Sequence, residues 1–289
     1  MKWNNFSPAV LTLLIFFLVQ GLGSLLLFFI GMLISPEFNE EVRAFLNGVT
    51  QDLPLFDKMP VSTFSLILII VDLLAVLACY LFLHNICLKT VGDVTSVKWR
   101  PGILAVVGGV LGALSISILT ETVEPPDVMM QMSLAMSHNF IGLLALVIIG
   151  PITEELIFRE AIEGEMLRRG TAPWIAILTS ALAFGLAHLN LAQSLYAFPL
   201  AILFGIIYYK TGNIVLTSLL HILNNGFAAI QLYTLGEDIE DISYAELFGG
   251  PLWAYTFMLL FGVACIVLMT MFYKHYPSFE ETEEKSCPL

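Results

Sequence analysis

The chain has 289 residues, of which 58% are hydrophobic and only 12% are charged, and its formal net charge is −12. A soluble domain usually carries about 25% charged residues, so this composition is typical of an integral membrane protein. The sequence has no cluster of basic residues, and a nucleic-acid partner is therefore not expected. A membrane β-barrel is not expected either, because its short segments of alternating polarity are missing.

Long apolar segments recur along the chain, and about 20 apolar residues suffice to span a bilayer as a helix. We expect spans at 8–34, 61–83, 102–119, 139–163, 174–190, 194–209, 213–233 and 251–273. Several of these boundaries coincide with proline or glycine, which commonly mark helix ends. The sequence therefore predicts an all-α membrane protein, a polytopic bundle of about eight transmembrane helices with an intramembrane polar cavity.

Positive charge in the short loops predicts the orientation of this bundle in the membrane. If the N-terminus is cytoplasmic, most lysines and arginines fall in cytoplasmic loops, whereas acidic stretches such as "GEDIEDISYAE" fall outside. We therefore expect a multi-pass protein of the cell membrane, in contact with lipid, with both termini cytoplasmic. Residues 1–135 are expected to form an N-terminal helical region, 136–275 a membrane core that carries the polar segments, and 276–289 a disordered acidic tail.

The stretch "GPITEELIFRE" places Glu154, Glu155 and Arg159, three charges within six positions, in a predicted span, where one ionised side chain costs roughly 3 kcal/mol. Glu155 and Arg159 are four residues apart, so they share a helix face and can pair. Glu154 lies about 100° away around the helix and lacks that partner. Pro151 cannot donate to the carbonyl of Val147, which loosens the helix one turn before the acids. We therefore expect a structural Glu155–Arg159 pair beside a reactive Glu154.

Two later segments bring further polar groups into predicted spans. "FGLAHLN" places Phe184 and His188 four residues apart on one helix face, and "LLHILNNGF" does the same for His221 and Asn225. Asn224 is a weaker candidate for the role of Asn225. A single intramembrane histidine or asparagine is often a contact between helices worth about 1 kcal/mol. Three helices that each carry catalytic types of side chain instead favour a functional site.

The other charged residues near these segments have simpler interpretations. We expect a solvated amphipathic extension beyond the bilayer, made of Glu160, Glu163, Glu165, Arg168 and Arg169. Asp72, inside the second predicted span, is interpreted as a structural hydrogen-bond acceptor, with a role in a transport pathway as the alternative.

The three polar segments resemble the motifs of the CPBP family of intramembrane proteases, which includes the Rce1-like type II CAAX prenyl endopeptidases. "EELIFR" is similar to the family's EExxxR motif, "FGLAH" to FxxxH and "HILNN" to HxxxN/B. The resemblance covers residues 139–235 and implies a membrane hydrolase, an endopeptidase. Its peptide or protein substrate would enter from the membrane or from the cytoplasmic side.

The resemblance also implies a role for each matching position. Glu154 would activate a water molecule with the help of His188, and His221 and Asn225 would stabilise the tetrahedral oxyanion. The supporting or substrate-binding set consists of Glu155, Arg159 and Phe184. The family is commonly labelled metalloprotease, so a divalent metal such as zinc on Glu154, His188 and His221 is one alternative, and hydrolysis without a metal is the other.

Two other classes of function could use the same buried cluster. One is a transporter coupled to protons or ions, and the other is a non-catalytic scaffold or an immunity-type protein that binds a partner. The transporter has less support, because the sequence shows neither an inverted repeat nor paired broken helices. The intact motifs favour the enzyme, and both prenylated and unprenylated substrates are compatible with them.

Overall fold

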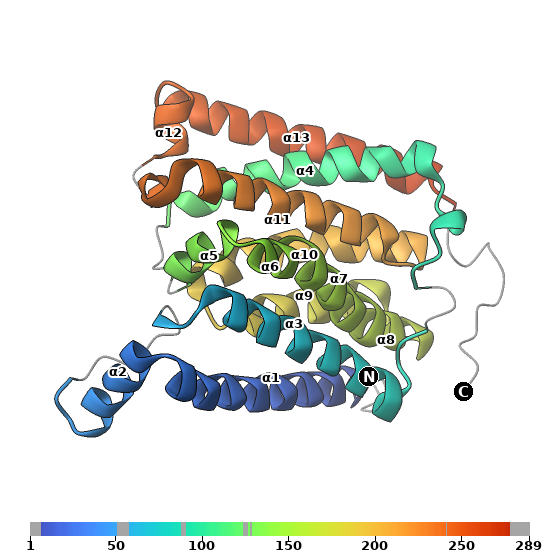
Figure 1. The fold of residues 1–289 in the computed structure, drawn as a ribbon. Helices are drawn as coiled ribbons and strands as arrows, with labels where there is room; N and C mark the ends of the chain where they lie inside the picture. Colours follow the sequence, from blue (N-terminus) through green and yellow to red (C-terminus); the bar gives the residue numbers. More distant parts are fainter. Residues whose placement is uncertain are drawn as a thin grey trace.

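The computed structural model describes residues 7–50, 58–87, 91–123, 127, 129–240 and 242–277, so the predicted acidic tail lies almost entirely outside the described residues. All regular elements within these ranges are helical, and Figure 1 shows them side by side in one bundle. Among them, seven are long and apolar enough to cross a membrane: Ala9–Ile34, Val61–Leu83, Trp99–Glu121, Phe140–Arg168, Leu191–Thr211, Val215–Ile239 and Pro251–His275. The protein is therefore a polytopic helical membrane protein.

The first half of the described chain contains three long helices and several short ones. Its elements are α1 (Ser7–Ile34), α2 (Pro36–Leu46), α3 (Val61–Ala78) with a π-helical extension (Cys79–Leu83), a short 3-10 helix (Val94–Ser96), α4 (Trp99–Glu121) and α5 (Met130–Ser137). Local sequence explains where α2 begins, because the side chain of Ser35 accepts a hydrogen bond from the Phe38 N–H and Pro36 occupies the first turn.

The second half contains one long composite helix followed by a hairpin and two further spans. The composite helix consists of α6 (Phe140–Leu143), a π-helix (Leu144–Ile149), α7 (Gly150–Glu154), a second π-helix (Glu155–Gly164) and α8 (Glu165–Arg168). Then follow α9 (Pro173–Ala187), α10 (Leu191–Thr211), α11 (Val215–Leu235), a 3-10 helix (Gly236–Glu240), α12 (Tyr244–Leu247) and α13 (Pro251–His275). The predicted span 174–190 thus corresponds to α9, a shorter helix of 15 residues.

The helices are arranged with α1 at one side of the bundle and α13 and α4 at the opposite side (Figure 1). The start of α1 and the end of α13 lie at the same end of the bundle, near α8, whereas α2 and α12 lie at the other end. This arrangement is compatible with two termini on the same side of a membrane. Which side is cytoplasmic stays a prediction from the loop charges.

Glycines let α4 approach its neighbours closely. A Cβ atom on Gly112 would lie 2.7 Å from Cδ1 of Leu203 on α10 and 2.8 Å from Sγ of Cys265 on α13. A Cβ atom on Gly109 would overlap the side chain of Leu220 on α11. Membrane helices associate through this kind of close contact, since lipid provides no hydrophobic driving force between them. Helix α4 therefore joins α10, α11 and α13.

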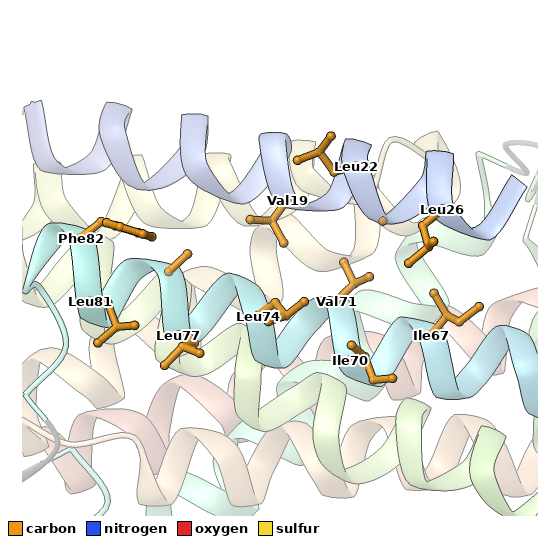
Figure 2. Close-up of a pocket in the computed structure, with 12 residues that line it drawn as sticks. Val19, Leu22, Leu26, Ile67, Ile70, Val71, Leu74, Leu77, Leu81 and Phe82 are labelled. Atoms are coloured by element: carbon orange, nitrogen blue, oxygen red, sulfur yellow. The ribbon is translucent and has the colours of Figure 1, made fainter. Parts of the chain in front are cut away.

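An apolar groove with a volume of about 390 Å³ lies between α1 and α3 (Figure 2). Its walls are mainly aliphatic and include Val19, Leu22 and Leu26 of α1 and Ile67, Leu74 and Leu77 of α3. None of the predicted site residues lines this groove. The polar cavity expected from the sequence is a different feature and stays a prediction.

Candidate active site

The helix that carries "GPITEELIFRE" contains two π-helical segments, one on each side of α7. Such π-helical turns are rare and are frequently found at functional sites. In a π register each N–H bonds to the carbonyl five residues earlier, as the Gly150 N–H does with the carbonyl of Ala145. The register therefore determines which carbonyl lacks a backbone donor because of Pro151.

Pro151 has no N–H, so in this register the carbonyl of Leu146 lacks a backbone donor. Asn225 of α11 takes that place, and its Nδ2 donates to the Leu146 oxygen at 3.0 Å. The α-helical register expected from the sequence would have affected Val147, and the π register moves the effect by one residue. Because Pro151 has no N–H, the Leu146 carbonyl is left to accept from Asn225. This bond connects α11 to the composite helix that carries Glu154, Glu155 and Arg159, called the charged helix below.

Glu155 and Arg159 form the predicted ion pair, with 3.1 Å between Oε2 and Nε and both side chains 0% exposed. The Nη1 of Arg159 also donates to Oγ of Ser180 on α9 at 2.8 Å. The guanidinium carbon lies 5.2 Å from the ring centroid of Phe184 and 5.6 Å from that of Phe204, within the range of cation–π attraction. This pair therefore connects the charged helix to α9 and α10.

His221 of α11 lies between the two glutamates. Its Nδ1 is 3.1 Å from Oε1 of Glu155, and its Nε2 is 3.5 Å from Oε2 of Glu154. The Glu154 side chain is 33% exposed, whereas that of His221 is 5% exposed. Because Glu155 is ion-paired with Arg159, its carboxylate accepts a hydrogen bond from Nδ1 of His221, and Nε2 of His221 is directed toward Glu154. The geometry thus distinguishes a buried, paired Glu155 from an accessible Glu154.

Phe184 of α9 links the two histidines. Its ring centroid lies 4.9 Å from that of His188 and 5.7 Å from that of His221. The Nδ1 of His188 is 2.9 Å from the carbonyl oxygen of Phe184. Since a carbonyl only accepts hydrogen bonds, Nδ1 carries a proton, and in the neutral ring Nε2 then has the lone pair. The structure therefore brings His188 to the cluster through Phe184, with a basic nitrogen at Nε2.

The predicted solvated extension is wrong for Glu160, whose residue is 1% exposed. Its carboxylate accepts hydrogen bonds from the Cys87 N–H at 3.1 Å, from Nη1 of Arg168 at 2.9 Å and from the hydroxyl of Tyr208. Three donors compensate the loss of water, which is the condition under which a buried charge is tolerated. Sequence reasoning missed this cluster because the donors come from distant parts of the chain.

The same prediction is wrong for Glu163, which is 0% exposed. Both of its carboxylate oxygens lack a hydrogen-bond partner, and so does Nη2 of Arg159. Gly205 of α10 leaves the space for this side chain, since a Cβ atom there would lie 2.9 Å from Oε2 of Glu163. The spacing of four residues between Arg159 and Glu163 is the sequence signal that could have found this neighbour. The other charged residues of the extension, Glu165, Arg168 and Arg169, form ion pairs with partly exposed side chains.

Asp72 of α3 accepts a hydrogen bond from Nε2 of Gln20 on α1 at 2.8 Å, as expected of a structural acceptor. It is also close enough to Glu154 for the two carboxylates to interact electrostatically. The N-terminal helices therefore contribute a carboxylate to the surroundings of the candidate site, although no motif was recognised in them.

The predicted metal ligands do not form a metal-type site. Among the described residues, no group of three or more histidine, cysteine, aspartate or glutamate side chains is arranged so that it could hold a metal ion. A catalytic zinc usually has three protein ligands, and Glu154, His188 and His221 do not provide such a set in this geometry. We therefore derive no step through a metal.

Comparison with known proteins adds independent information about this region. Residues 136–227 match the family model described as type II CAAX prenyl endopeptidase, Rce1-like. That range contains every predicted site residue: Glu154, Glu155, Arg159, Phe184, His188, His221 and Asn225.

Two curated proteins are similar to parts of the chain. The membrane-embedded CAAX protease MroQ of Staphylococcus aureus (strain USA300) is 35% identical over 88 residues, which is 29% of this chain and 36% of the relative. YdiL of Bacillus subtilis (strain 168), named as a candidate membrane peptidase, is 34% identical over 84 residues, which is 29% of this chain and 34% of that protein. The matched part thus spans about a third of each relative. No solved structure matches the chain significantly.

Proposed function

We propose that this chain, which belongs to the Rce1-like CPBP family of membrane proteases, hydrolyses a peptide bond in a membrane-associated protein or peptide. The observation that carries the proposal is the convergence of Glu154, Glu155 and His221 from two helices, with Glu154 the accessible carboxylate. Ionisable groups inside a membrane are costly and usually functional. A carboxylate base next to fixed N–H donors is the combination that amide hydrolysis needs.

In the proposed reaction, Glu154 accepts a proton from a water molecule whose oxygen attacks the scissile carbonyl carbon. The lone pair on Nε2 of His188 helps to hold that water. The carbonyl oxygen becomes an oxyanion, which accepts hydrogen bonds from Nε2 of His221 and Nδ2 of Asn225. Glu154 then transfers its proton to the amine nitrogen as the C–N bond breaks, so the carboxylate is regenerated.

The Glu155–Arg159 pair supports this reaction without touching the substrate's reacting atoms. The carboxylate of Glu155 accepts from Nδ1 of His221, which orients the ring so that Nε2 points toward Glu154. In this role Nε2 of His221 carries the hydrogen that the oxyanion accepts. Arg159 forms the ion pair that holds the Glu155 carboxylate in this position.

The test uses the purified full chain in nanodiscs with two fluorogenic C-a-a-X peptides, one farnesylated and one without the lipid. We expect the wild type to cleave at least one of them, and Glu154→Gln and His221→Ala to lower the rate by about 10²–10⁴-fold. The same substitution on the exposed 3-10 helix, Glu237→Gln, serves as the matched control and leaves the rate unchanged.

Cleavage by both site variants at the wild-type rate would contradict the proposal. A proton flux that depends on Glu154 in vesicles, without cleavage of either peptide, would instead support the transporter. Comparison of the two peptides decides whether the lipid is required for cleavage.

A further inference from the structure

Asn225 is the last member of a chain of hydrogen-bonded side chains. The hydroxyl of Tyr196 on α10 donates to Oδ1 of Asn224. The Nδ2 of Asn224 donates to Oδ1 of Asn225 at 3.2 Å, and the Nδ2 of Asn225 donates to the Leu146 carbonyl at 3.0 Å. Each bond in the series therefore runs from donor to acceptor in the same direction, from α10 through α11 to the charged helix.

This direction decides which way the amide of Asn225 faces. Its orientation is defined by the partners of its oxygen and nitrogen atoms. If the amide were turned over, its oxygen would meet the oxygen of Leu146, and its nitrogen would meet the nitrogen of Asn224. Both contacts would be repulsive. In the observed orientation, Nδ2 of Asn225 points to the Leu146 carbonyl. This hydrogen bond uses one of the two amide hydrogens of Asn225, and the second is available to a substrate oxygen.

The far end of this series of hydrogen bonds lies beside α4 and α12. Ser117 of α4 is close enough to interact electrostatically with the hydroxyl groups of Tyr196 and of Tyr244 on α12. The backbone N–H of Tyr244 in turn lies 3.0 Å from both carboxylate oxygens of Glu121, the last residue of α4. The Tyr196 hydroxyl therefore lies near polar groups of α4 and α12 and donates to Asn224.

We propose that Tyr196 and Asn224 are positioning residues that hold the amide of Asn225 with its N–H groups toward the reacting carbonyl; this role rests on the proposed function. Neither residue touches the reacting atoms. Without the donor on Tyr196, Asn224 can turn over and present its oxygen to the oxygen of Asn225. The amide of Asn225 then loses its defined orientation, and an oxygen directed at the oxyanion raises the energy of the transition state.

The test is a double-mutant cycle in the peptide cleavage assay. Tyr196→Phe keeps the ring and removes the donor, and we expect kcat to fall by about tenfold to a hundredfold with KM unchanged. In an Asn225→Ala background the same substitution should cause no further loss, because Tyr196 acts through Asn225. The matched control is Tyr233→Phe on α11, whose exposed ring packs on His138 and which should keep the wild-type kcat.

An unchanged kcat in Tyr196→Phe, or an equal loss with and without Asn225, would overturn the inference. A second readout does not depend on catalysis. Tyr196→Phe and Asn224→Leu break the same hydrogen bond, so their effects on the Tm of the purified protein should be strongly non-additive. Additive shifts in Tm would mean that Tyr196 and Asn224 do not share a hydrogen bond, which would contradict the proposed series. If the wild type cleaves neither peptide but the effects of Tyr196→Phe and Asn224→Leu on Tm are non-additive, the proposed function is contradicted. The hydrogen bond between Tyr196 and Asn224 would still be supported.

Discussion

Replacement of Arg159 by methionine is the most informative perturbation of the buried cluster. The substitution keeps an unbranched apolar side chain but removes the guanidinium. Glu155 then loses its ion pair, Ser180 loses a donor to its hydroxyl oxygen, and the nearby Glu163 carboxylate loses the positive charge with which it interacts. Because Glu155 and Glu163 are both 0% exposed, water does not replace the lost partner. Glu155 would keep only its contact with His221, and Glu163 would remain without a hydrogen-bond partner.

The magnitude follows from the burial. Removal of one partner from a buried ion pair costs about 3–5 kcal/mol, because the remaining charge is left without compensation. The matched control is Arg169→Met, which also removes an arginine from a pair with a glutamate four residues earlier, Glu165 at 2.7 Å. The Arg169 side chain is 43% exposed, so that pair contributes about 0.5 kcal/mol or less. The two substitutions should therefore differ by several kcal/mol in the free energy of unfolding.

The assay is unfolding of the purified protein in mixed micelles with an increasing fraction of SDS, followed by circular dichroism. The double variant Glu155→Gln, Arg159→Met removes the strongest unpaired charge and should recover part of the stability that Arg159→Met loses. Equal losses for Arg159→Met and Arg169→Met would refute the reasoning. So would a double variant whose loss equals the sum of the two single losses.

Two further predictions concern residues close to this cluster. Glu163→Gln removes a buried carboxylate that has no hydrogen-bond partner, so we expect the free energy of unfolding to stay the same or to rise. Glu160→Gln disturbs three hydrogen bonds and should lower the free energy of unfolding by about 1–3 kcal/mol. The same micelle titration measures both, and a larger loss for Glu163→Gln would contradict the assignment. Pro151→Ala restores an N–H that competes with Asn225 for its acceptor, so peptide cleavage should slow while stability is kept or increased. Pro199→Ala, inside α10, is the control that should not slow cleavage.

Local spacing explains what could be predicted of the site. Glu155 and Arg159 pair because residues four apart share a helix face, and that relation holds in α-helical and π-helical turns alike. Phe184 and His188 are neighbours for the same reason. His221 contacts Glu155, 66 positions away, and Glu154, one position further; the motif resemblance assigned these residues to one site, which spacing alone could not do.

The errors arose where a helix is covered by its neighbours. Glu160 and Glu163 follow an apolar span and were expected in water, because acidic residues are rarely buried without partners. In the structure, the hydroxyl of Tyr208 on α10 donates to Glu160. Gly205 on the same helix leaves room for Glu163 because it has no side chain. Neither residue carries a local signal of that contact. The burial of the two glutamates therefore depends on the packing of α10 against the charged helix.

Without the structure, one could predict a polytopic helical membrane protein, the positions of most of its spans and the three segments that carry its unusual polar groups. These features follow from composition, length and short-range spacing, which the chain specifies locally. The tertiary structure alone decided that Asn225 binds the carbonyl exposed by Pro151, that Phe184 connects the two histidines, and that Glu154 is more accessible than Glu155. Those features depend on the π-helical register and on which helices are adjacent, because hydrogen bonds between helices are made by residues that are distant in the chain.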